Sequence, residues 1–155
     1  MFRTISTILT ITLLLAGCQQ RNRFHVGSFE QPVEVNINRF DLDFIALDTT
    51  NAVSGLIALG NKYPVFTPVF LSEVLMMEVA DTIENASQIK SFLQDTTFQA
   101  VHQQVRTTFD DVTVIEKQFS KAFSYLRLYF PAIQLPEIYF FVSGFNRQFL
   151  LTDSA

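Results

Sequence analysis

The two histidines and the carboxylates are the side chains with which this chain could hold a catalytic metal. A zinc peptidase places two histidines one helical turn apart and adds a glutamate that activates water. His25 and His102 lie far apart in the sequence, and neither has a carboxylate at ligand spacing. We therefore predict no metal site and no cofactor, and we expect His102 to lie at the surface of a helix or at the boundary of the core.

Ser143 is the candidate for a serine nucleophile, because Gly144 follows it directly. The sharp elbow that presents the serine of a hydrolase needs a glycine two residues before and two residues after it. Phe141 and Phe145 occupy those positions here, so a serine in a turn is the simpler interpretation.

Arg39, Asp41 and Asp43 form a charged group at the start of the first expected helix. Two neighbouring carboxylates could share acid–base work. Residues two positions apart lie on different faces of a helix, however, and helix capping with a salt bridge to Arg39 accounts for both aspartates. We therefore predict that the chain is not an enzyme, and we treat these three residues as a candidate partner-docking patch.

The only cysteine, Cys18, follows an apolar run that begins at Ile5 and is preceded by the basic Arg3. The run is too short to span a bilayer permanently, and its order of charge, apolar residues and small residues is that of a cleavable secretory signal. Small residues directly before the cysteine form a lipobox. We predict that residues 1–17 are a lipoprotein signal peptide and that Cys18 carries acyl chains such as palmitate. The alternative is an ordinary signal peptide that leaves a free thiol.

The charge balance narrows the class of partner. The chain has 11 basic and 15 acidic side chains, a net charge of −4, which argues against binding to nucleic acid. It equally argues against electrostatic adhesion to anionic lipid, so acyl chains on Cys18 would have to provide the attachment to the membrane. Seventeen phenylalanines and no tryptophan indicate a core built largely from Phe rings.

The apolar periodicity predicts an α+β fold that is predominantly helical, with one N-terminal strand, five or six helices and a C-terminal β-hairpin. Residues 18–32 are polar and read as a flexible tether, and residues 33–155 form the domain. A hairpin at the end of the chain would leave an unprotected sheet edge, so we expect the domain to be incomplete at its C-terminus. The expected elements are strands at 33–38, 138–142 and 148–152, and helices at 41–47, 51–62, 67–79, 87–93, 97–109 and 112–130. Thr67 is the expected N-cap of the third helix. The expected buried residues include Val53, Leu56, Ile57 and Leu59 on the second helix, and Tyr129 and Phe130 on the apolar stripe of the last.

The chain resembles the GldB-type gliding-motility lipoproteins of Bacteroidota. The residues that carry this resemblance include a lipobox at Cys18, an Arg-Phe-Asp-x-Asp-Phe block at 39–44 and a Ser-Gly-Phe-Asn turn at 143–146, which are the more specific parts. Further matching segments are the rest of the block 37–48, Lys62-Tyr63-Pro64, Tyr129-Phe130-Pro131 and Thr152-Asp153.

The resemblance implies an envelope lipoprotein that is needed for gliding, is associated with the type IX secretion apparatus, and acts by binding envelope proteins. No acidic run follows Cys18, so we expect an outer-membrane lipoprotein that faces the periplasm, with an inner-membrane lipoprotein as the alternative. The family is also distantly similar to zincin-like predicted peptidases. A rival reading is thus the front half of a zinc peptidase-like enzyme whose metal-binding half lies beyond residue 155. A third reading is an envelope lipoprotein without a role in motility.

One short pattern recurs four times along the chain. Each copy is an aspartate, then Ser or Thr, then an aliphatic residue or Thr, and it resembles the O-glycosylation acceptor of exported Bacteroidota proteins. Helix capping by the aspartates is the alternative explanation. The hydroxyls in the four copies belong to Thr49, Thr82, Thr96 and Ser154.

Overall fold

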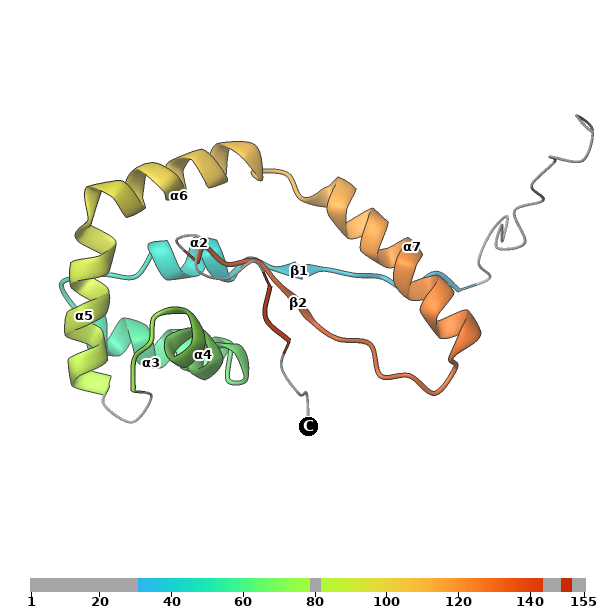
Figure 1. Ribbon diagram of the computed structural model, residues 1–155, viewed down its shortest axis with the longest axis horizontal. Coiled ribbons are helices and arrows are strands. Elements are labelled where there is room, and N and C mark those ends of the chain that lie inside the picture. Colours follow the sequence, from blue (N-terminus) through green and yellow to red (C-terminus); the bar gives the residue numbers. More distant parts are fainter. Residues whose placement is uncertain (1–30, 79–81, 144–148, 152–155) are drawn as a thin grey trace, which may run out of the picture. The chain divides into compact units, whose positions relative to one another are not determined.

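A core of Phe rings is built from helices and loops of residues 40–98, and a short sheet joins the two ends of the domain (Figure 1). The computed structural model describes residues 31–78, 82–143 and 149–151. Apart from Gln31, all of them belong to one unit that spans residues 32–155. The predicted signal peptide, Cys18, most of the tether and the Ser-Gly-Phe-Asn turn lie outside the described residues, apart from Ser143.

The described part is predominantly helical with a two-stranded sheet, which confirms the α+β class. No helix in this part is long and apolar enough to cross a membrane. In chain order the elements are β1 (Ile37–Asn38), α2 (Phe40–Ile45), α3 (Ala52–Lys62), α4 (Phe66–Val69), the π-helix η1 (Phe70–Val74), α5 (Thr82–Gln94), α6 (Thr96–Thr108), α7 (Thr113–Tyr129) and β2 (Ile138–Tyr139).

The expected C-terminal hairpin is wrong in its pairing. β2 runs parallel to β1, with Ile37 opposite Ile138, and residues 149–151 are not in a strand. Phe140 continues the pairing, because its N–H donates to Asn38 O at 2.9 Å and its carbonyl accepts from Asp41 N at 2.9 Å. These bonds pair one edge of β2 with the start of the domain.

The core confirms the expectation of packed Phe rings. Phe40 is 0 % exposed, and its ring centroid lies within 6 Å of the rings of Phe44, Tyr63, Phe66 and Phe70. Each such ring removes a large apolar area from water, and the edge-to-face and tilted arrangements suit aromatic quadrupoles. The core therefore centres on the first residue of α2, directly beside the charged group described above.

Two details of the expected helices are wrong. Of the four residues of α3 expected in the core, Leu56 and Leu59 are buried, but Val53 is 36 % and Ile57 is 52 % exposed. We expected Thr67 to cap a helix that runs to about residue 79, but its hydroxyl lies inside α4 and donates to Leu59 O at 3.2 Å. The helix then closes through Met76, whose φ of 55° is left-handed and is tolerated here without a glycine.

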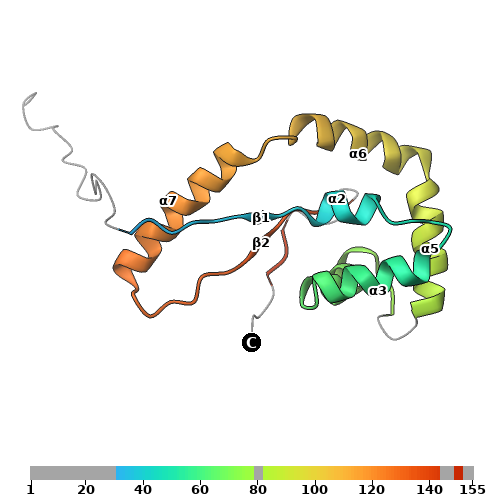
Figure 2. The same ribbon diagram turned by 180° about the vertical axis from the view of Figure 1, so that it is seen from behind.

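α7 carries the most regular apolar stripe of the sequence, yet this stripe is only half-buried. The one fully buried side chain of α7 is Ser124, whose hydroxyl accepts from Val33 N at 2.9 Å. About two helical turns before Ser124, Glu116 accepts from Ile37 N at 3.0 Å. These bonds hold the segment before β1 beside α7, as both views show (Figures 1 and 2), and they explain why the expected strand at 33–38 shortens to two residues.

Candidate functional site

The charged group of Arg39, Asp41 and Asp43 separates into two clusters in the structure. Arg39 binds Asp41 with two hydrogen bonds, Nε to Oδ1 at 3.0 Å and Nη2 to Oδ2 at 2.8 Å. Asp41 is only 3 % exposed, so this ion pair is nearly removed from water on its acidic side. The hydrogen bond to Asp41 raises the pKa of Arg39, against the smaller opposing effect of burial.

The backbone of Asp41 ties three parts of the domain together. Its carbonyl lies 3.1 Å from Nε2 of His102 on α6, and its N–H donates to Phe140 O beside β2. Because a carbonyl can only accept, the Nε2 nitrogen carries the proton and donates. The Arg39 guanidinium completes the arrangement by lying over the Phe140 ring, 5.8 Å from its centroid.

The expectation that His102 is a surface or boundary residue is wrong. The residue is 4 % exposed and follows the buried Phe98 by one helical turn on the inner face of α6. Its partner is the backbone carbonyl of Asp41, and the spacing of residues in the sequence does not predict such a long-range contact. Within the described residues, no three His, Cys, Asp or Glu side chains come together as a metal-binding group.

Asp43 belongs to the second, more exposed cluster, on a different face of α2 from Asp41. Its Oδ2 accepts from Lys62 Nζ at 2.5 Å and from the Tyr63 hydroxyl. The Tyr63 ring in turn meets the Tyr139 ring edge-on, with centroids 6.0 Å apart, and the Tyr139 hydroxyl donates to Glu137. The cluster thus joins α2, the end of α3 and β2.

The charges of this cluster are fixed at neutral pH. Burial raises the pKa of Asp43, but the hydrogen bonds from Lys62 and Tyr63 outweigh it and leave that pKa below its usual value. Burial and the bond to Asp43 raise the pKa of Tyr63, and burial and the bond to Glu137 raise the pKa of Tyr139 to about 12. Asp43 is therefore ionised and both tyrosines are protonated, as a stable structural cluster requires.

The structure places only some of the other candidate residues. Thr96 is exposed as the first residue of α6, and Thr49 is half-buried in the turn after α2. The side chain of Thr82, like Cys18 and Ser154, lies outside the described residues. The capping alternative is correct for Asp95, which accepts from Phe98 N at 2.8 Å.

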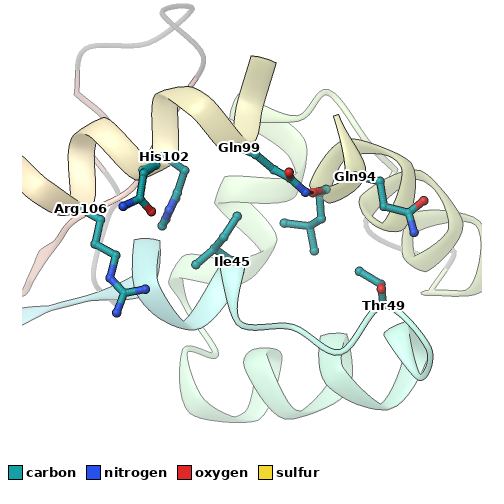
Figure 3. Close-up of a pocket in the computed structure, with 8 residues that line it drawn as sticks. Ile45, Thr49, Gln94, Gln99, His102 and Arg106 are labelled. Atoms are coloured by element: carbon teal, nitrogen blue, oxygen red, sulfur yellow. Dashed lines mark hydrogen bonds between the residues drawn. The ribbon is translucent and has the colours of Figure 1, made fainter. Parts of the chain in front are cut away.

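Two of the hollows on the described surface could receive a small ligand. The larger, of about 340 Å³, is bounded by the end of α2, the turn after it, the end of α5 and one face of α6 (Figure 3). The smaller, of about 260 Å³, lies between α3, α4, η1 and α5 and is mainly apolar, with Leu56, Pro64, Pro68 and Leu71 among its walls. Neither contains the Arg39–Asp41 pair or the Asp43 cluster.

Comparison with known proteins identifies the chain's family. No curated protein and no solved structure matches it. The family model GldB_lipo, described as "Gliding motility protein GldB", matches residues 21–155 and thereby confirms the resemblance found in the sequence. The match begins just after Cys18 and covers the whole described part of the domain. The chain belongs to the GldB family of gliding motility lipoproteins.

Proposed function

We propose that this protein is a lipid-anchored component of the gliding and type IX secretion apparatus and that it acts by binding other envelope proteins. Family membership associates the chain with gliding motility and with the cell envelope. The lipobox supports an anchor on Cys18, and the residues after it, Gln19, Gln20 and Arg21, form no acidic run. We therefore propose an outer-membrane lipoprotein facing the periplasm, with the inner membrane as the alternative.

Exposed apolar side chains at the end of α7 are the observation that carries a binding role. Leu128 and Tyr129 are each 51 % exposed, and Phe130, which follows α7 directly, is 60 % exposed. We had expected Tyr129 and Phe130 on the buried stripe of this helix. Three large apolar side chains exposed together exceed the scattered apolar residues of an ordinary surface and favour contact with another protein.

A photo-crosslinking experiment in gliding cells tests this docking surface. With a photoreactive residue at position 130, we expect an adduct with a protein of the gliding or type IX secretion apparatus, because apolar aromatic positions dominate protein interfaces. The same residue at position 121, where Lys121 lies outside the apolar stripe, serves as the control and should give no adduct.

The outcomes of this experiment separate the alternatives. A crosslink only to a second copy of this chain would show that the surface forms a homodimer. Equal labelling at positions 121 and 130 would contradict the proposed docking surface. Phe130→Ser should abolish the adduct formed from a crosslinker at position 129 without changing the unfolding midpoint, because the side chain is mostly in water.

Only part of the docking patch proposed at Arg39, Asp41 and Asp43 is accessible to a partner. Asp41 is buried against Arg39, so it has no surface to offer a partner. Asp43 and its neighbour Lys62 remain accessible, and we keep the docking proposal for this pair only.

We also propose O-glycosylation within the four Asp-Ser/Thr triplets. Thr96 is the more accessible of the two described hydroxyls, since Thr49 lines the larger hollow. Glycopeptide mass spectrometry of the native protein should find a glycan on the peptide that contains Thr96, and Thr96→Val should remove it. Four bare hydroxyls, at Thr49, Thr82, Thr96 and Ser154, would contradict this proposal.

A further inference from the structure

The larger hollow is open to solvent and is lined mainly by polar side chains. Its volume of about 340 Å³ falls at the lower end of the range for such sites in proteins. Figure 3 shows Arg106 and His102 toward one end, Gln94 and Thr49 toward the other, and Ile45 between them. The complete lining is Ile45, Thr49, Leu93, Gln94, Gln99, His102, Gln103 and Arg106.

The lining carries one guanidinium, that of Arg106, and three amide side chains but no carboxylate, in a chain whose net charge is −4. Asp110, four residues after Arg106, acts electrostatically on Arg39 and raises its pKa. The aspartates directly beside Thr49 and Gln94 in sequence accept hydrogen bonds from their own segments. Asp48 accepts from the N–H and the hydroxyl of Thr50, and Asp95 accepts from Phe98 N. Arg106 belongs to neither of the ion pairs found among the described residues, so its guanidinium is available to a ligand.

Two of the wall residues are fixed in place by their own hydrogen bonds. His102 donates to Asp41 O and is buried, and Gln99 donates from Nε2 to Leu93 O at 2.9 Å. Both bonds hold α6 against its neighbours. Arg106 and Gln103 follow these two residues by one helical turn each, so they project from a stretch of helix that is already anchored. Because this stretch of helix is already held in place, binding a ligand costs less conformational entropy.

We propose that this hollow binds a small organic oxyanion, with its carboxylate or phosphate group on Arg106 and its polar remainder toward Gln94 and Thr49. A guanidinium presents a planar fork of donors that matches either group with two parallel hydrogen bonds. Gln103 supplies a further amide donor, and Ile45 and Leu93 provide apolar contact for a short carbon chain. This site is separate from the α7 docking surface, and the two proposals are tested independently.

Isothermal titration calorimetry on the full chain in detergent tests the site with three probes, sodium gluconate, sodium phosphate and sodium chloride at matched ionic strength. We expect saturable binding of gluconate or phosphate and none of chloride. Binding of gluconate alone identifies a hydroxylated carboxylate as the ligand class, and binding of phosphate alone identifies a phosphate. Absence of saturable binding for both probes would overturn the proposal.

Arg106→Gln should weaken that binding by at least about tenfold, because it removes a charge-assisted pair of hydrogen bonds. Arg127→Gln, which removes the same charge from the exposed end of α7, is the matched control and should leave the affinity unchanged. Gln103→Ala should weaken binding by a smaller factor and provides a second test should Arg106→Gln alter the fold. Equal affinity in wild type, Arg106→Gln and Gln103→Ala would show that the anion binds elsewhere.

Discussion

Replacing Asp41 with alanine should lower the free energy of unfolding by about 3 kcal/mol. The change leaves the Arg39 guanidinium, whose side chain is 17 % exposed, without its counter-charge inside the domain. Urea unfolding followed by circular dichroism measures the loss directly. The effect should be large because the same residue also lies next to Phe40, at the centre of the core.

Asp43→Ala is the matched control for this substitution. Asp43 lies on the same short helix, but its ion pair with Lys62 is largely solvated, so its loss should cost about 1 kcal/mol or less. Replacing Arg39 and Asp41 together by leucine should recover much of the stability lost in Asp41→Ala, since no charge is then left buried. Equal losses in Asp41→Ala and Asp43→Ala would contradict the view that the buried pair is the more important one.

Replacing Cys18 with serine should move the protein from the membrane fraction to the soluble fraction almost completely. A sulfur-linked diacyl group provides two chains that together hold a protein stably at a bilayer, and serine cannot form this anchor. The net negative charge of the chain offers no electrostatic substitute. Cell fractionation with immunoblotting measures the distribution, and loss of gliding in the same strain would link the anchor to function.

Gly17→Ala is the control for the anchor, because it keeps a small residue before the cysteine and should preserve processing. Cys18→Ser protein that stays in the membrane fraction would favour a different mode of attachment. The unfolding midpoint of the domain should not change in either variant, since both substitutions lie before the residues that the family model matches.

The helices could be predicted from the sequence because their signals are local. α6 starts at Thr96 after Asp95, which caps it, and α7 ends before Pro131, as periodicity and turn residues indicate. The closure of η1 through Met76 could not be predicted, because no glycine marks the left-handed position. The pairing of β1 with β2 was equally hidden, since alternation shows that a segment is extended but not which strand it joins.

For the candidate sites, too, contacts within one element could be predicted and contacts between elements could not. The spacing of Asp41 and Asp43 predicted that they lie on different faces of a helix, and the pair of Arg39 with Asp41 is present as expected. The expected helix capping is wrong, because both aspartates lie inside α2 and its N-cap residue makes no side-chain hydrogen bond. The partners that come from other elements were missed, namely Lys62 and Tyr63 for Asp43 and His102 for the Asp41 carbonyl. The larger hollow was missed for the same reason, because its walls come from separate helices.

The parallel pairing of β1 with β2 sets an order on folding. Closing a loop of roughly a hundred residues costs conformational entropy before any strand contact offsets it, and such long-range contacts slow folding. The buried Phe cluster draws only on residues 40–98 and can pack early, whereas Tyr139 and Phe141 join Phe66 and Phe70 only when β2 pairs with β1. Until the sheet closes, that side of the aromatic core is open to aggregation and to chaperones.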